Sequence, residues 1–138
     1  MKRLFLMLAI ALFLTSSYAQ ILTVNDVPAT VTKSFKKTHP KVDTVQWSKT
    51  GDVYKASYDL KMKDMSATYT AAGKLQQTEA EITVASLPTA ALKYLNENYP
   101  ADVVKSSSKV TSAKGKVTYA VKIKGMDLTF SSTGKIIT

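Results

Sequence analysis

The most reactive side chain in this sequence is its single histidine, His39, which could act as a general base or bind a metal. The segment "VPATVTKSFKKTHP", residues 27–40, returns as "LPTAALKYLNENYP", residues 87–100, and the counterpart of His39 is Tyr99. Because the two copies share only a ring before a proline, the position requires ring volume rather than an imidazole. We therefore interpret His39 as a structural residue.

Carboxylates and two glycine-lysine turns are the other candidates for chemistry. Glu79 and Glu81 share one face of a predicted strand and could hold a hard cation, but one pair supplies fewer than the roughly six oxygens that calcium needs. The fragments "TAAGK" and "SSTGK" lack the full spacing of a phosphate-binding loop, so we interpret them as hairpin turns. The remaining acids of interest are expected to be solvated, in turns or on a wet strand face: Asp52, Asp59, Asp64 and Asp127. The sequence predicts no catalytic residue, no metal site and no cofactor, and we expect no enzyme activity.

The internal repeat predicts two short helices. Asp26 and Ser86 hold equivalent places as helix N-caps, and each is followed by a proline in the first turn, where a missing N–H does no harm. Apolar residues then recur every four positions in both copies, which builds one buried stripe. Each helix is expected to end before Pro40 or Pro100, because a proline disfavours helical geometry in the residue before it.

After each helix the apolar period changes to two, which is typical of strands with one wet face. The first such segment is "VYKASYDLKMK", residues 53–63, and "KVTYAVKIK", residues 116–124, repeats the scheme. Residues 65–75 also correspond to residues 126–136, with the turn "GK" at the same place in both. Trp47 opens the strands of the first unit, and we interpret it as a core residue, with a ligand-stacking ring as the alternative.

These motifs resemble the PepSY-like, β-lactamase-inhibitor-like family of small exported proteins found largely in Bacteroidetes. The resemblance rests on the apolar-proline helix start, the aromatic-proline or histidine-proline end, the tryptophan strand, the Tyr-x-Ala-x-Tyr strand and the Gly-Lys turn, twice over. It implies an α+β fold in which two tandem repeats form an antiparallel sheet with both helices on one face. It also implies protein binding rather than catalysis. β-Lactamase inhibitors of this shape carry disulfides, which this cysteine-free chain lacks, so the activity of those inhibitors is not carried over to this chain.

The first nineteen residues are typical of a secretory signal peptide. Lys2 and Arg3 precede the apolar run "LFLMLAIALFL", which is too short to span a bilayer of about 30 Å, and the small residues Ser17 and Ala19 precede the cut. We predict cleavage after Ala19, a periplasmic or secreted location, and no membrane span. The rest, residues 20–138, is expected to be one domain made of two repeats, about 24–83 and 84–138.

The charge of the exported chain comes from lysine alone. Of the 19 basic residues, Lys2 and the sole arginine, Arg3, leave with the signal peptide, so 17 lysines face 10 acidic residues. Without the planar fork of arginine, specific recognition of nucleic acid is not expected. Lysines can still attract acidic partners over a distance.

The predicted function is that of an exported protein-binding module, inhibitory or regulatory toward an unidentified exported or envelope protein that could be acidic. If both helices cover one face of the sheet, alternation assigns five lysines to the other face as a candidate binding surface: Lys55, Lys61, Lys116, Lys122 and Lys124. One alternative is a basic, envelope-associated binder of acidic glycans, lipid head groups or other polyanions. Another is a solvated face kept charged for solubility.

Overall fold

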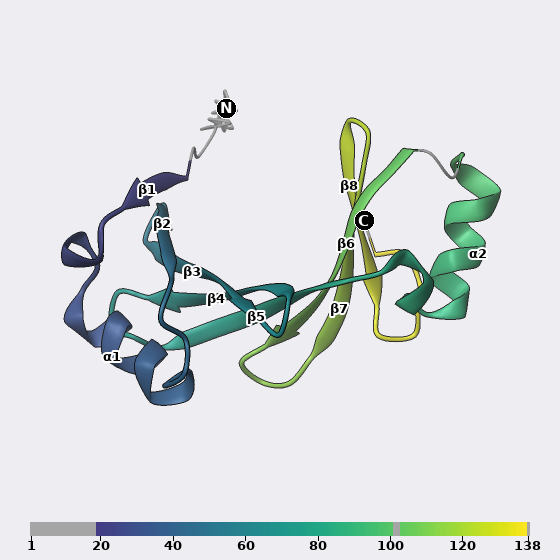
Figure 1. Cartoon of the computed structure of the whole chain (residues 1–138). Coiled ribbons are helices and arrows are strands. Elements are labelled where there is room, and N and C mark those ends of the chain that lie inside the picture. Colours follow the sequence, from purple (N-terminus) through teal and green to yellow (C-terminus); the bar gives the residue numbers. More distant parts are fainter. Residues whose placement is uncertain (1–18, 101–102, 138) are drawn as a thin grey trace, which may run out of the picture.

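The computed structural model describes residues 19–100 and 103–137, so the predicted signal peptide lies outside the described residues apart from Ala19. Eight strands and two α-helices are found in this part of the chain (Figure 1). The first unit contains β1 (Gln20–Leu22), α1 (Ala29–Thr38), β2 (Gln46–Thr50), β3 (Val53–Leu60), β4 (Lys63–Thr70) and β5 (Leu75–Ile82). The second contains α2 (Thr89–Asn98), β6 (Val104–Ser112), β7 (Val117–Ile123) and β8 (Met126–Ser131).

All eight strands belong to one antiparallel sheet in which spatial order follows chain order, from β1 to β8. Figure 1 shows this sheet strongly twisted, with α1 near one end and α2 near the other. The junction between the units is an ordinary ladder, in which residues 77–82 of β5 pair with residues 107–112 of β6. The predicted α+β class, with two helices and an antiparallel sheet, is confirmed.

The helix starts differ from the prediction in one respect. Asp26 and Ser86 are not N-caps; each is the last residue of a 3₁₀ turn, Val24–Asp26 or Val84–Ser86, and Pro28 or Pro88 directly precedes the α-helix. The Asp26 carboxylate instead accepts hydrogen bonds from the backbone N–H and the hydroxyl of Thr23, at 3.2 and 2.6 Å. It therefore stabilises the turn that leads into the helix rather than the helix itself.

Each helix buries its stripe in a separate hydrophobic core. In the first core, Val31 and Phe35 of α1 pack with side chains of β2, β3 and β4, among them Trp47, which is only 4% exposed. In the second, Ala91 and Leu95 of α2 pack with the apolar side chains of β7 and β8. The spacing of four and the interpretation of Trp47 as core are both confirmed.

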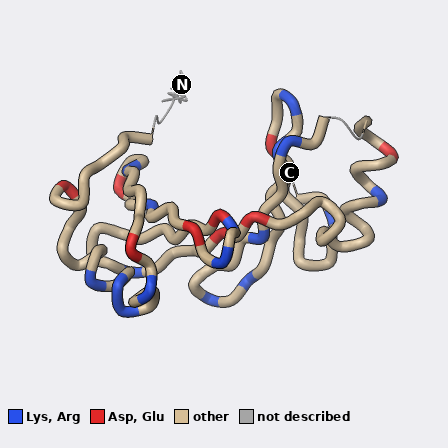
Figure 2. Tube along the Cα trace, viewed as in Figure 1, with Lys and Arg blue, Asp and Glu red and all other residues tan. Residues whose placement is uncertain are grey.

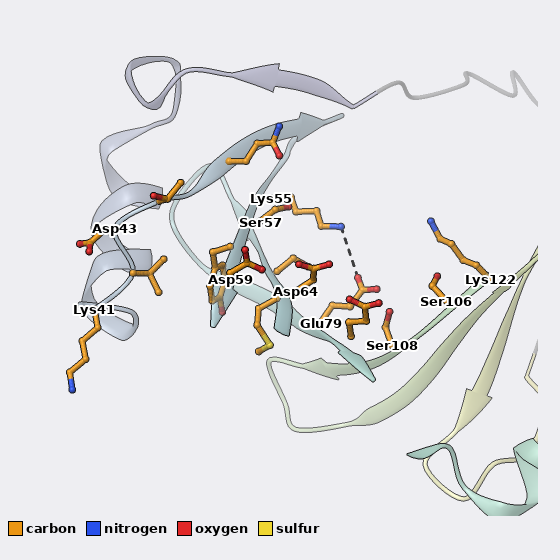
Figure 3. Close-up of a pocket in the computed structure, with 17 residues that line it drawn as sticks. Lys41, Asp43, Lys55, Ser57, Asp59, Asp64, Glu79, Ser106, Ser108 and Lys122 are labelled. Carbon is orange, nitrogen blue, oxygen red and sulfur yellow. Dashed lines mark ion pairs between the residues drawn. The ribbon is translucent and has the colours of Figure 1, made fainter. Parts of the chain in front are cut away.

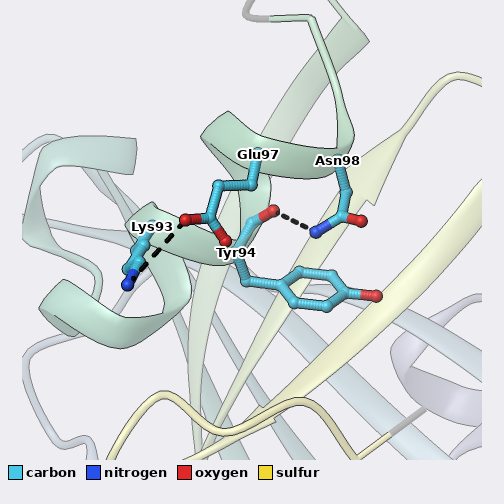
Figure 4. Close-up of polar contacts among 4 residues, drawn as sticks. All are labelled: Lys93, Tyr94, Glu97 and Asn98. Carbon is cyan, nitrogen blue, oxygen red and sulfur yellow. Dashed lines mark hydrogen bonds and ion pairs between the residues drawn. The ribbon is translucent and has the colours of Figure 1, made fainter.

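The outer surface of α2 is held by local contacts. Lys93 forms an ion pair with Glu97 one turn later, at 3.8 Å between Nζ and Oε1, and the Asn98 amide donates to the Tyr94 carbonyl at 2.8 Å (Figure 4). Both charged side chains are well exposed, so this pair contributes only a few tenths of a kcal/mol, as is usual for helix pairs four residues apart.

The first long hairpin also differs from the prediction. The sequence predicts one strand through residue 63, but β3 ends at Leu60, and a two-residue turn of Lys61 and Met62 leads into β4 at Lys63. Asp64 therefore lies in β4 and Asp127 in β8 rather than in turns. This change of direction places the acids of β3 and β4 opposite each other.

Candidate binding groove

A groove of about 990 Å³ crosses the strands of both units (Figure 3). Side chains of β3 to β7 line it, together with the segment that precedes β2. The lining is mostly polar and charged. Its main members are Lys41, Asp43, Lys55, Ser57, Asp59, Asp64, Ser66, Glu79, Glu81, Ser106, Ser108 and Lys122, with Val42, Tyr58 and Met65 as apolar parts of the wall.

Strand alternation explains why these side chains meet. In β3 the buried residues Tyr54, Ala56 and Tyr58 belong to the first core. Lys55 and Ser57 alternate with them and therefore point to the opposite face. The ladder carries this face across the sheet, because Ser57 is opposite Ser66 in β4, and Ser66 is opposite Glu79 in β5. The polar half of each strand thus becomes one wall of the groove.

Negative charge is concentrated at the centre of the groove. Asp59 lies directly opposite Asp64, and a hydrogen bond with Asp64 and its charge raise the pKa values of both Asp59 and Glu81. Carboxyl groups with raised pKa values favour the folded state at low pH, and this contribution is lost as the pH rises through those values. At neutral pH the row therefore repels itself and favours binding of a positive group.

The five candidate lysines are divided by the structure. Lys55 and Lys122 line the groove, and Lys55 approaches Glu79 at 4.0 Å (Figure 3). Lys61, Lys116 and Lys124 lie instead in hairpin turns or immediately beside them. What sequence reasoning missed is the row of acids between the two groove lysines. Their alternation was visible in each strand, but only the register brings Asp59, Asp64 and Glu81 together.

His39 serves the first core. Its ring stacks on Phe35, with centroids 4.6 Å apart, and its two nitrogens lie 2.8 Å from the Thr38 and Tyr58 hydroxyl oxygens. These contacts tie the end of α1 to β3, so the structural interpretation is confirmed. They also hold Tyr58, whose pKa is raised by burial, in place at the groove wall.

The other candidates for chemistry have ordinary surroundings. Glu79 faces Lys55 and Glu81 interacts with Asp64, so the two glutamates have different neighbours. Among residues 19–100 and 103–137, no three side chains of the usual ligand types gather as a metal site requires. Within the same residues, no helix is both long enough and apolar enough to cross a membrane. The "TAAGK" and "SSTGK" segments form turns, as predicted.

Comparison with protein families gives one match, found twice in the chain. A family model described as "Putative beta-lactamase-inhibitor-like, PepSY-like" matches residues 14–77 and again residues 57–138. No curated protein matches the chain. The two overlapping matches agree with the tandem arrangement of helix and strands.

Several solved structures share the fold. One from Bacteroides eggerthii DSM 20697, described as "putative periplasmic proteins", has a TM-score of 0.73 at 18% identity, covering 81% of this chain and 86% of the other. A DUF2874 family protein from Bacteroides uniformis ATCC 8492 has a TM-score of 0.69 at 23% identity, with coverages of 80% and 86%. A BLIP-like protein from Bacteroides fragilis NCTC 9343 has a TM-score of 0.64 at 21% identity, with coverages of 80% and 84%.

Proposed function

Because the chain belongs to the PepSY-like, beta-lactamase-inhibitor-like family, we propose that it is an exported, non-enzymatic protein-binding module whose groove holds part of another exported protein. The observation that carries this proposal is the groove itself. It runs across the strands of both units, and its lining is mainly polar and charged, so it offers many hydrogen-bonding and ion-pairing groups to part of a protein. Its carboxylates, serines and lysines have no histidine among them that could serve as a base beside a nucleophile.

The proposal includes both helices on one face of the sheet, which leaves the other face to the groove. The register of the ladders supports this arrangement. Met65, which packs against the first core, is opposite Ala80, and the same row continues through Lys109 to Tyr119, which packs against the second core. Residues in one row share a face, which supports placing the two cores on the same side of the sheet.

The proposal also includes an extracytoplasmic location. Residues 1–19 have the pattern of a signal peptide cleaved after Ala19, and one of the similar structures is described as periplasmic. We take residues 24–83 and 84–138 as the two repeats of the exported chain. Nucleic acid is not among the expected partners, because no arginine remains for base recognition.

A bulky side chain on the groove floor tests the function directly. Ser108 lies in β6 opposite Glu81 and is half-buried, so Ser108→Tyr fills the groove without disturbing a core. We expect tagged wild-type protein to retain, from periplasmic extract at high salt, a protein that mass spectrometry identifies and that the purified variant fails to bind. Ser132→Tyr, in an exposed turn outside the groove, is the matched control and should bind like the wild type. Equal binding by both variants would place the partner elsewhere.

The polyanion alternative predicts a different result. Charge attraction alone is screened beyond roughly 8 Å at physiological ionic strength, so every captured molecule should then elute with salt. Adhesion of this kind would also be indifferent to Ser108→Tyr. The salt dependence and the groove variant therefore separate the two functions in one experiment.

The candidate lysines provide a second prediction, on association rate. Lys122→Glu combined with Lys124→Glu should slow association with an acidic partner and leave the melting temperature nearly unchanged, because charges at an interface act mainly on the rate of encounter. Lys33→Glu combined with Lys36→Glu on α1 changes net charge equally and is the control. Stopped-flow or surface-plasmon measurements at low salt give the rates. If both pairs slow association alike, only net charge matters and the polyanion alternative gains.

A further inference from the structure

The β3–β4 hairpin is longer than its counterpart in the second unit. Tyr58 pairs with Met65, and six residues connect them, whereas Ile123 pairs with the equivalent Met126 across a turn of only two residues. The additional residues form two more pairs, Asp59 with Asp64 and Leu60 with Lys63. They carry the turn of Lys61 and Met62 beyond the rest of the hairpin. We call residues 61–63 the hairpin tip.

This extension is unfavourable for the isolated chain. Lys61 and Met62 have φ values of 51° and 64°, a region that side chains other than glycine rarely adopt, whereas the shorter turn of the second unit has Gly125 at 89°. Met62 is fully exposed, at 100%, and Leu60 is 40% exposed. Two aspartates face each other directly behind the tip. Strain and exposed apolar surface at a projecting turn are typical of a contact site.

The tip matches the groove beside it in chemistry. It presents one apolar side chain, Met62, between two lysines. The groove has apolar wall residues and three lysines, of which Lys55 is paired with Glu79, and its acids Asp59, Asp64 and Glu81 have no lysine partner of this kind among the described ion pairs. Over the last residues of the hairpin the charge therefore changes from acidic, at the Asp59–Asp64 pair, to basic at the tip. Two such hairpins side by side in opposite directions can bring the tip of each against the Asp59–Asp64 pair of the other. One surface is then complementary to itself, as a two-fold interface requires.

We propose that a second copy of this chain occupies the groove, in a two-fold dimer in which each hairpin tip enters the groove of the other copy. The lysines of each tip meet the acids of the partner's groove, and Met62 meets its apolar wall. The acids behind the tip argue against an anionic membrane as the occupant, because they would be repelled by it. The dimer goes beyond the proposed function and regulates it, since a tip in the groove competes with any foreign protein for the same space.

Charge exchange tests the dimer without knowledge of any foreign partner. The exported chain should show a concentration-dependent change from monomer to dimer in sedimentation velocity over the micromolar to millimolar range. Lys61→Glu with Lys63→Glu, or Asp59→Lys with Asp64→Lys, should each weaken self-association about tenfold or more, because like charges then meet at both contacts. A mixture of the two variants should form a heterodimer as tight as the wild type, since opposite charges meet again. A wild type that stays monomeric, or a mixture that does not associate, overturns the proposal.

A second variant separates loss of contact from loss of folding. Asn and Gly suit a two-residue turn with two positive φ values, so Lys61→Asn with Met62→Gly should relieve the strain and raise the melting temperature. The same variant should strongly weaken the dimer, because two of the three contact side chains are gone and only Lys63 remains. A dimer that persists undiminished in this variant overturns the proposal. If the variant instead loses a protein captured by a monomeric wild type, the tip serves a foreign partner, and the proposed function survives without the dimer.

Discussion

Replacing Trp47 by alanine is expected to lower the free energy of unfolding by about 3 to 5 kcal/mol, the usual cost of deleting a large aromatic ring from a core. Trp47 is 4% exposed and meets Phe35 edge to face, with ring centroids 5.6 Å apart. Its neighbours in β1 and β3, Leu22 and Ala56, are aligned with it in register. Because backbone strands hold these neighbours, they cannot move in to fill the space, and a cavity remains. Urea denaturation followed by circular dichroism measures the change.

The second unit contains no tryptophan, so it offers no equivalent ring to compare with Trp47. The most informative control is therefore Trp47→Phe at the same position. Phenylalanine keeps an aromatic ring against Phe35 and should restore most of the lost stability. A change below about 1 kcal/mol for Trp47→Ala would contradict the burial, since a deleted core ring cannot cost so little. That result would favour the alternative interpretation, in which Trp47 lies at the surface and its ring stacks on a ligand.

Most of the fold could be predicted from the sequence because each pattern of apolar residues and turns occurs twice. Val31 and Phe35 recur as Ala91 and Leu95, so a spacing of four seen in one helix is checked by the other. The ring at His39 could be assigned to packing for the same reason. A property that both copies share at a position is required by the fold, whereas a property found in one copy alone belongs only to that residue.

The parts that could not be predicted are those in which the copies differ. The extension of the first hairpin has no counterpart in the second unit, and strand alternation continues through Lys61 and Met62 without a glycine to mark the turn. The acid row was hidden for another reason. Whether Asp59 and Glu81 share a neighbour in Asp64 depends on register across three strands, which periodicity within one strand does not reveal.

The second large effect on stability is expected at the Gly-Lys turns that the two units share. Gly73→Ala and Gly134→Ala should each lower the free energy of unfolding by about 2 to 5 kcal/mol, because a positive φ and a steric overlap act together. Gly73 has φ 82°, and a Cβ there would overlap the Thr30 carbonyl oxygen of α1. Gly134 has φ 90°, and a Cβ there would lie 2.7 Å from the Ala91 backbone nitrogen of α2. In both units the turn thus packs directly on the first turn of the helix.

Gly125→Ala separates the two causes. Gly125 has nearly the same φ, 89°, but a Cβ there meets nothing within 4 Å, so its replacement should cost only the backbone strain of about 1 kcal/mol. The difference between Gly73→Ala and Gly125→Ala then measures the contact between turn and helix, read from denaturant midpoints at constant slope. Equal losses at the two positions would show that the helix can move away from the turn. In that case the glycine in each repeat is needed only for its positive φ, and the "GK" turns do not fix the helices on the sheet.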